Sequence, residues 1–503
     1  MNLADTTKLN QGTENKIDLT ACWFCHQSTK IGICAYCGIN TEATVEERAK
    51  LEKANLFSKT QRVCIPPLAN FSKTIQAFVG WNCWEHIVLA ASTVKWALLA
   101  SIVGILAGSA SALFLTLLSS ATKFRISHPW MLWLLPVCGL LIGYVYYQWG
   151  KVVEKGNNLI IDNIHQPKKV IPLLMAPMIL FSTVLTHLFG GSAGREGTAV
   201  QMGGSLASWL AQKLSLGAED TRLILMAGMS AGFGAVFGTP LAGAIFGMEV
   251  QSVGRIRYEG IIPCLIASIV GDIVCSCWGV AHTHYKHAEA ITLNGLLFAK
   301  LAIAGIAFGL AALLFSELTH AISDGFKRWI SWPPLRPVIG GIIIISLTYL
   351  VGSQDYLGLS LPMLTTSTEG GYISKYAFIL KLIFTAITLG AGFKGGEVTP
   401  LFVIGATLGH TLGLIMGEPP ELFAAVGFVA VFGAAANTPI ACLLMGIELF
   451  GGAIALPYGI TCILAYVFSG HRGIYLAQPI ESPKSKSLQV SNGETLRQVR
   501  ERI

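Results

Sequence analysis

Residues 190–204 read Gly-Gly-Ser-Ala-Gly-Arg-Glu-Gly-Thr-Ala-Val-Gln-Met-Gly-Gly, a glycine-rich break that carries a carboxylate inside apolar sequence. About 200 residues later, residues 394–400 read Lys-Gly-Gly-Glu-Val-Thr-Pro. In one register Glu196 matches Glu397, and Thr198 matches Thr399. Glycine-broken apolar segments at corresponding places in two halves of a chain are how a secondary transporter builds a binding site near the middle of the membrane.

A second pair of segments, residues 233–249 and 432–448, has the same spacing. Both contain Phe-Gly-Ala, then Thr-Pro, and both end in a carboxylate, Glu249 or Glu448. Neither carboxylate has a nest of glycines around it. The two residues therefore fit a packing or interfacial role better than a second ion site.

The composition excludes a water-soluble protein. Of 503 residues, 53% are hydrophobic and only 13% are charged, whereas a soluble domain has about 25% charged residues. Apolar runs recur from residue 87 to residue 468, and those at 96–118, 130–149 and 170–189 are long enough to span a bilayer. We expect an all-α polytopic membrane protein with tilted and broken helices.

The distribution of charge predicts the orientation. The net charge is +7, but the basic residues are scattered, which argues against a nucleic-acid partner. Two basic connections, around residues 151–169 and 327–336, predict cytoplasmic loops. The first 80 residues are polar and lack the apolar core of a signal peptide. We therefore expect a multi-pass protein of the cell (inner) membrane with both termini in the cytoplasm.

Four of the twelve cysteines form a pattern of two pairs in residues 1–80, namely Cys22, Cys25, Cys34 and Cys37. Two Cys-x2-Cys knuckles can close a tetrahedral thiolate site for a structural zinc ion. Two disulfides are the alternative, which a cytoplasmic location disfavours. The other cysteines are mostly single residues in apolar runs, typical of membrane packing.

Glu196 is a candidate ion-site residue because it opens a stretch that continues as a helix. The N-terminus of a helix offers unpaired N–H groups and a positive dipole end, which suits an anion. A carboxylate there can occupy the anion site, and on protonation it can leave the site free. A structural ion pair with Arg195 is the alternative. In the second half, Pro400 marks the helix start next to Glu397, so two helix N-termini can share one site.

These motifs resemble the CLC family of chloride channels and proton-coupled anion antiporters. Residues 194–198 are similar to that family's Gly-Lys/Arg-Glu-Gly-Pro motif, whose Glu is the external gate and proton carrier. Residues 396–400 resemble its Gly-x-Phe-x-Pro motif, and Tyr475 falls where the family has an anion-coordinating tyrosine. The resemblance covers residues 85–480. It implies two inverted repeats (about 85–280 and 290–480), a homodimer in the lipid bilayer, one pore per subunit, and no cofactor for transport. A polar tail, residues 481–503, would follow.

Departures from the common motifs resemble the family's fluoride-exporting branch. Asn157 stands where chloride-selective members have a serine, and Thr198 replaces the proline of the gate motif. Val398, preceded by Glu397, replaces the phenylalanine of the later motif. Val250 stands where chloride/proton antiporters have an internal glutamate. The resemblance thus implies a fluoride/proton antiporter. Its gating and proton-transfer residues would be Glu196 and Glu397, and its anion-binding residues would be Asn157, Gly197, Thr198, Val398, Thr399 and Tyr475.

The chemistry of fluoride agrees with this interpretation. Fluoride is small and strongly hydrated, so its site needs compact, strong hydrogen-bond donors to offset dehydration. The Asn157 amide, the Thr399 hydroxyl and backbone N–H groups are such donors. Glu397 would repel the anion when ionised and would donate a hydrogen bond to it when protonated.

Other functions stay open at this point. A chloride/proton antiporter and a passive chloride channel share the same scaffold. Residues 190–194 match the G-x-S-x-G motif of serine hydrolases, but a helix-like run precedes them where that motif needs a strand, so we do not expect an enzyme. His282, His284 and His287 suggest either a metal site or a solvated loop. The cysteine pairs could bind a regulatory partner.

Overall fold

The computed structural model describes residues 83–166, 170–283, 285–286, 291–485, 487–488 and 490–502. The chain divides into two compact units, Met1–Ile87 and Val88–Ile503. Of the first unit only residues 83–87 are described, so the helices of the fold and the site belong almost wholly to the second unit. The expected zinc ligands Cys22, Cys25, Cys34 and Cys37 lie outside the described residues, as do His284 and His287.

The described residues are helical, and β pairing among them is limited to isolated bridges. The first half contains α3 (Cys83–Ser127), η1 (Pro129–Leu134), α4 (Leu135–Trp149), α5 (Asn157–His165), α6 (Met175–Leu188), α7 (Glu196–Lys213), α8 (Ala218–Phe237), α9 (Pro240–Glu249), η2 (Tyr258–Gly260) and α10 (Ile261–Cys277). The second half contains α11 (Gly295–Trp329), α12 (Leu335–Val351), α13 (Leu361–Thr368), α14 (Ala377–Gly390), α15 (Val398–Met416), α16 (Pro420–Ala436), α17 (Pro439–Phe450), η3 (Gly452–Ile454), α18 (Ala455–Phe468) and α19 (Leu496–Arg502).

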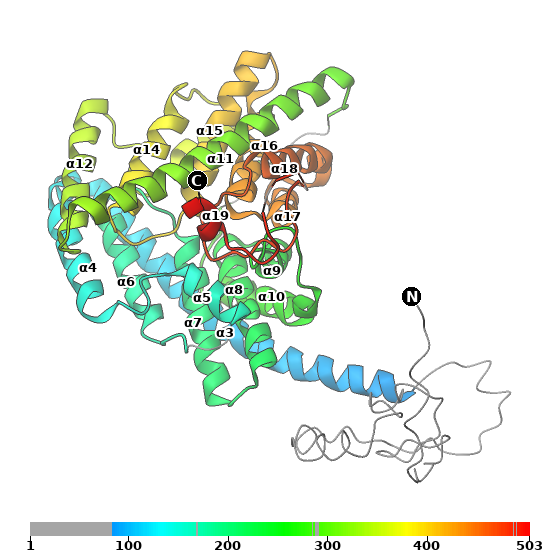
Figure 1. The fold of residues 1–503 in the computed structure, drawn as a ribbon. Helices are drawn as coiled ribbons and strands as arrows, with labels where there is room; N and C mark the ends of the chain where they lie inside the picture. The colour runs from blue at the N-terminus through cyan, green and yellow to red at the C-terminus, as the bar shows by residue number, and fades with distance from the viewer. Residues whose placement is uncertain are drawn as a thin grey trace, which may run out of the picture. The chain divides into compact units, whose positions relative to one another are not determined.

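The two halves repeat the same order of helices. The helices α6 to α10 have counterparts in α14 to α18, with short helices at the same places in each series. Helix α7 packs on α8 as α15 packs on α16, and α9 packs on α17 where the halves meet (Figure 1). The duplication in the sequence is therefore a duplication of structure.

Close glycine contacts of the same kind bring the two long helices of each half together. A Cβ atom at Gly203 of α7 would lie 2.1 Å from the carbonyl oxygen of Gly228 in α8. A Cβ atom at Gly405 of α15 would lie 2.1 Å from the carbonyl oxygen of Gly427 in α16. Such contact needs glycine on both helices, as in the small-residue interfaces of membrane helices.

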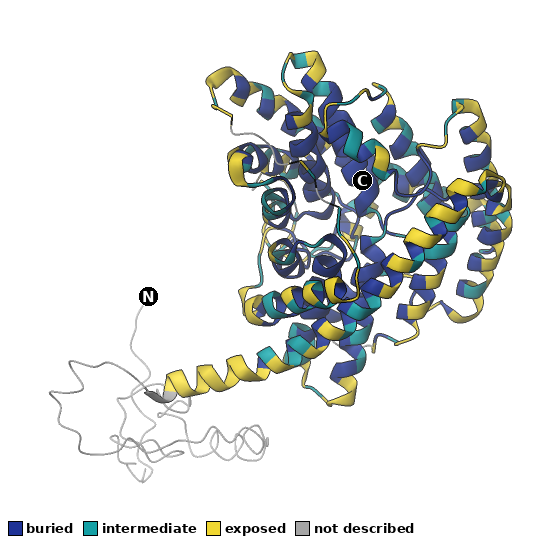
Figure 2. Ribbon diagram, turned by 180° about the vertical axis from the view of Figure 1, so that it is seen from behind, coloured by how far each residue is buried: buried dark blue, intermediate teal, exposed yellow. Residues whose placement is uncertain are grey.

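Aromatic side chains fill the core where the halves meet. The ring of Phe233 in α8 stacks on Phe246 in α9 at 4.2 Å between centroids and lies 6.1 Å from Phe432 in α16. Phe402 in α15 stacks on Phe428 in α16 at 4.0 Å. The interior helices are accordingly buried, while apolar residues stay exposed on the outer helices, as expected of a surface that faces lipid (Figure 2).

Five helical stretches in the described residues are long and apolar enough to cross a membrane: Glu85–Ser127, Pro129–Trp149, Tyr258–Cys277, Gly295–Trp329 and Val398–Met416. The expectation of one spanning helix over residues 170–189 is wrong. Helix α6 has 14 residues and begins only at Met175, so the first five residues of this apolar run are not helical. Helices of 10–17 residues fill the interior, which fits the predicted broken helices.

The described C-terminal residues pack against the membrane helices. Arg500 of α19 pairs with Glu317 at 3.2 Å and with Asp324 at 2.8 Å, both on α11. Leu496 and Val499 are buried against Val253 and Ile480. The segment that carries Tyr475 is thus followed by residues that are fixed against α11 and Val253.

Candidate anion and proton site

The two glycine-rich breaks pair with each other through the backbones of Gly194 and Gly396, and we call this place the crossing. The Gly194 N–H donates to the Gly396 carbonyl at 2.6 Å, and the Gly396 N–H donates to the Gly194 carbonyl at 2.8 Å. A Cβ atom at Gly396 would lie 2.8 Å from the backbone nitrogen of Gly197. Only glycine permits this approach, which places the starts of α7 and α15 next to one another.

The carboxylate of Glu196 reaches across this crossing to the N-terminus of α15. Its side chain is fully buried. Its Oε2 atom accepts the Thr399 backbone N–H at 3.0 Å, and the Thr399 hydroxyl lies 2.6 Å from Oε1 and 2.5 Å from Oε2. The Arg195 backbone N–H and Nε donate to the same carboxylate at 3.1 and 3.2 Å. The carboxylate thus occupies an anion-binding position at a helix N-terminus, and the predicted contact with Arg195 is one part of that arrangement.

Glu397 occupies the matched position of the second half in a different environment. It is the residue before α15 and is only partly buried. No hydrogen bond or ion pair joins its carboxylate to another described residue. Its backbone nitrogen lies near Gly197, 3.9 Å from where a Cβ atom on that glycine would be. The side chain therefore lies beside the crossing without a fixed partner.

A third helix N-terminus meets the other two. Asn157 is the first residue of α5, and its Nδ2 atom lies 3.4 Å from the position of a Cβ atom on Gly197. Its Oδ1 atom is buried and has no hydrogen-bond partner among the described residues. The next residue, Asn158, accepts the Ala477 N–H at 2.8 Å through Oδ1. The α5 N-terminus is thereby tied to the segment that follows Tyr475.

Tyr475 is buried in this segment. The Ile474 N–H donates to the Ala435 carbonyl at 2.9 Å. The Gln478 N–H closes the turn by donating to the Tyr475 carbonyl at 3.1 Å, and its Nε2 atom donates to the Val250 carbonyl at 2.7 Å. Val250 is itself buried, so a buried apolar side chain stands at the position where the sequence motifs of chloride/proton antiporters have a glutamate.

Not every predicted residue presents its side chain to the crossing. The Thr198 hydroxyl lies 2.7 Å from that of Thr183 on α6, so it is engaged away from Glu196. Val398 is buried at the first position of α15 and offers only its backbone to an ion. The sequence did not identify Thr183, because one threonine in an apolar helix carries no distinguishing signal.

Glu249 and Glu448 have a structural role. Glu249, the last residue of α9, accepts the N–H groups of Ile440 and Ala441 at 3.1 and 2.8 Å at the start of α17. Glu448 near the end of α17 accepts those of Leu241 and Ala242 at 2.9 and 2.8 Å at the start of α9. Each half caps a helix of the other half, which confirms the packing interpretation.

The hydrolase motif forms no serine–histidine pair. Both His187 ring nitrogens contact carbonyl oxygens, those of Thr183 at 2.9 Å and Ala193 at 3.0 Å. The Ser192 hydroxyl accepts a hydrogen bond from Lys381 Nζ at 2.9 Å. Lys381 is fully buried, and its Nζ atom donates to four oxygens, so it holds Ser192 within a hydrogen-bond network. A single lysine within an apolar run was the sequence signal that could have identified it.

The histidine cluster gives no metal site in the described part of the chain. His282 Nε2 lies 3.4 Å from Asp272 Oδ1, and no group of three or more metal-ligating side chains occurs among the described residues.

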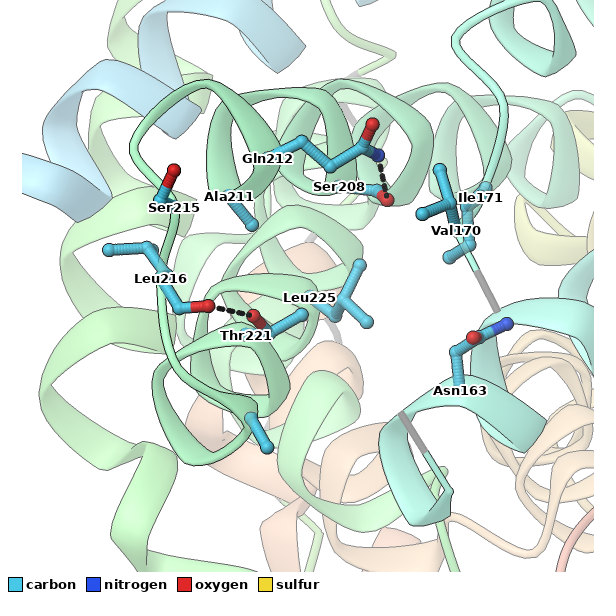
Figure 3. A pocket seen from close by; sticks show the side chains of 11 residues that line it. Asn163, Val170, Ile171, Ser208, Ala211, Gln212, Ser215, Leu216, Thr221 and Leu225 are labelled. Carbon is cyan, nitrogen blue, oxygen red and sulfur yellow. Dashed lines mark hydrogen bonds between the residues drawn. The ribbon is translucent and has the colours of Figure 1, made fainter. Parts of the chain in front are cut away.

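A pocket of about 290 Å³ lies at the far end of α7 from Glu196 (Figure 3). It is lined by Ser208 and Gln212, which are hydrogen-bonded to each other, and by Leu216, Thr221 and Leu225 among others. Sixteen residues of helix separate Gln212 from Glu196, or about 24 Å at 1.5 Å per residue. The pocket is therefore not part of the crossing.

Comparisons with known proteins agree with this geometry. Residues 138–470 match the family described as "Voltage gated chloride channel". The chain is 50% identical over 406 residues to the "Chloride/fluoride channel protein" of Pseudomonas syringae pv. tomato, which covers 80% of this chain and 90% of that protein. It is 29% identical over 339 residues to the "H(+)/Cl(-) exchange transporter ClcA" of Vibrio cholerae, which covers 61% of this chain and 70% of that one.

Solved structures show the same architecture. A CLC-type fluoride/proton antiporter superposes with a TM-score of 0.75 at 34% identity, covering 76% of this chain and 98% of the other. A slow cyanobacterial Cl⁻/H⁺ antiporter superposes with a TM-score of 0.65 at 20% identity, covering 76% and 96%. The second likeness concerns the fold alone.

Proposed function

The chain belongs to the voltage-gated chloride channel (CLC) family, and from this premise we propose that it is an antiporter that exports fluoride in exchange for protons, with Glu196 as its gate. The observation that carries this proposal is the position of the Glu196 carboxylate on the N-terminus of α15. A negatively charged side chain held by the Thr399 N–H and hydroxyl occupies a site that suits a dissolved anion equally well.

Protonation supplies the coupling in this mechanism. An ionised carboxylate makes stronger hydrogen bonds than a neutral one. When Glu196 takes up a proton, its hold on Thr399 weakens and the side chain can leave. An anion then takes over the vacated donors, and the proton travels on the departed carboxyl. The anion and the ionised carboxylate thus replace one another on the same donors, and each replacement binds or releases a proton, which couples the two fluxes.

The selection of fluoride rests on the groups beside this place. We propose that the anion-binding residues are Asn157, Gly197, Thr198, Val398, Thr399 and Tyr475. Glu397 supports the fluoride assignment, since it has no fixed partner among the described residues and can donate to fluoride once protonated. The two relatives whose names mention fluoride support the same choice.

Val250 favours one alternative, a passive chloride channel. Without a carboxylate at this position, an antiporter must move protons inward through other groups, whereas a passive channel needs no proton route. Proteoliposomes loaded with fluoride or with chloride separate the alternatives when anion efflux and external pH are followed together. We expect fluoride efflux to be accompanied by proton uptake into the vesicles. Equal rates for both anions would refute the fluoride assignment, and efflux without a pH change would refute exchange.

The organisation of the whole chain belongs to the same proposal. We propose a homodimer in the inner membrane with both termini cytoplasmic, a transport domain at residues 85–480, and a structural zinc ion held by Cys22, Cys25, Cys34 and Cys37. Metal analysis of the purified protein tests the last point. Zinc at one ion per chain that disappears in Cys22→Ser/Cys25→Ser is the expected result, and an equal zinc content in both proteins would contradict it.

A further inference from the structure

Arg125, in the last turn of α3, is a buried cation without a partner. Only 8% of its surface is exposed. Its guanidinium makes no hydrogen bond or ion pair with another described residue, and its Nε atom is wholly enclosed. A guanidinium carries five N–H donors and no acceptor. An enclosed donor of a charged group that has no acceptor is costly in free energy, so the Nε–H group of Arg125 calls for one.

Two glycines with positive φ lie against this side chain. A Cβ atom on Gly358 (φ +60°) would lie 3.4 Å from Arg125 Nη2, and one on Gly190 (φ +92°) would lie 3.8 Å from Arg125 Cδ. Gly190 opens the loop that leads to Glu196, and the Gly358 N–H donates to the Gly191 carbonyl at 3.2 Å. The guanidinium therefore lies behind the gate loop with backbone, not side chains, on two sides.

Two basic side chains share the surroundings of Gly358 with Arg125. A Cβ atom on Gly358 would lie 3.9 Å from His187 Cδ2, and Lys381 Nζ donates to the Gly358 carbonyl at 2.8 Å. The four partners of Lys381 are two hydroxyls and two carbonyls, and both partners of His187 are carbonyls, so all of them are neutral oxygens. None of the ion pairs in the described part of the chain brings a carboxylate to Arg125 or Lys381. Arg125 is thus left without a carboxylate counter-ion among the described residues.

We propose that Arg125 binds a monovalent anion of halide size, at a second anion site behind the gate loop and distinct from the place held by Glu196. The anion neutralises the guanidinium, which donates two parallel N–H groups to it. The site does not depend on which halide the protein transports.

Calorimetric titration of sodium fluoride into the purified protein tests this site. We expect Arg125→Gln to bind one anion fewer per subunit than the wild type. Glu196→Gln should bind one more, because its pore position is vacated, and the double variant should match the wild type in number. Lys123→Gln is the matched control, since Lys123 is exposed in the same turn of α3 and loses the same charge.

The two proposals fail in different ways in this titration. If Arg125→Gln bound the same number of fluoride ions as the wild type with the same affinity, the second site would be refuted. If Glu196→Gln gained no anion, the gate would be in question and the second site would not. Should Arg125→Gln not fold, Arg125→Lys keeps the charge without the planar fork and should weaken this site roughly tenfold. Unchanged affinity in Arg125→Lys would also refute the second site.

Discussion

The starts of α7 and α15 have the same backbone plan and different chemistry. Both follow a glycine-rich break, α7 begins at Glu196 and α15 directly after Glu397, and each packs through a glycine onto the next helix. Yet Glu196 is fully buried and hydrogen-bonded across to Thr399, while Glu397 is partly exposed and has no partner among the described residues. The two halves thus build the crossing from the same backbone plan, but at this place, among the described residues, only the first half sends a carboxylate across to the other helix.

Removing the charge of the two acidic residues should have unequal effects. We expect Glu196→Gln to lower proton-coupled fluoride efflux roughly 100-fold, because glutamine cannot carry the proton and a proton-transfer group contributes about 10²–10⁴-fold. Glu397→Gln should lower it only about tenfold, because the Glu397 carboxylate has no hydrogen-bond partner among the described residues. Efflux and pH records from proteoliposomes measure both, with exposed Glu369→Gln as the control. Coupling that survived both substitutions would contradict the assignment of these two residues.

The glycine contacts should respond equally in the two halves. Gly203→Ala and Gly405→Ala each force a methyl group to within 2.1 Å of a carbonyl oxygen. We expect each to cost about 2 kcal/mol of stability, as overpacking does in a dense core. Thermal unfolding in detergent compares them. Gly217→Ala is the control because a Cβ atom there would meet nothing within 4 Å. A large difference between the two variants would mean that the halves are not packed equivalently.

Substitutions of the matched threonines, Thr399 and Thr198, should have unequal effects on anion leak. Thr399→Val removes a hydroxyl that donates to the gate carboxylate, so we expect roughly tenfold faster anion leak at neutral pH. Thr198→Val removes only the contact with Thr183 and should change the leak by less than about threefold. Uncoupled anion flux measured at zero proton gradient checks this. Equal leaks would show that Thr198 also serves the gate.

The reciprocal caps should give the smallest effect. Glu249→Ala and Glu448→Ala each remove an acceptor for two N–H groups at a helix start, for which we expect a loss of about 1 kcal/mol. The apparent unfolding temperature should fall by a few degrees while fluoride/proton coupling persists. Loss of coupling at normal stability would instead assign Glu249 or Glu448 to the proton route.

Much of this arrangement follows from the sequence, because glycines and carboxylates in apolar runs have few physical explanations. The duplicated breaks, the helix after Glu196 and the early proline of α15 were all predictable. The choice between Thr399 and Thr198 as partner of Glu196 was not, since both follow an acidic residue at the same spacing. Lys381 and Arg125 also escaped prediction: their neutral oxygen and backbone neighbours come from segments distant in sequence.

The exchanged caps of α9 and α17 also bear on how the chain is made. Ala242 takes its acceptor from Glu448, a residue 206 positions later. At a synthesis rate of about 5–20 residues per second, roughly 10–40 s pass between the two. Throughout that interval the start of α9 lacks its acceptor inside the membrane, where open N–H groups are costly. The start of α9 therefore reaches its final hydrogen bonding only after the second half has been synthesised and inserted. A nascent chain that stops before Glu448 leaves these N–H groups without their acceptor.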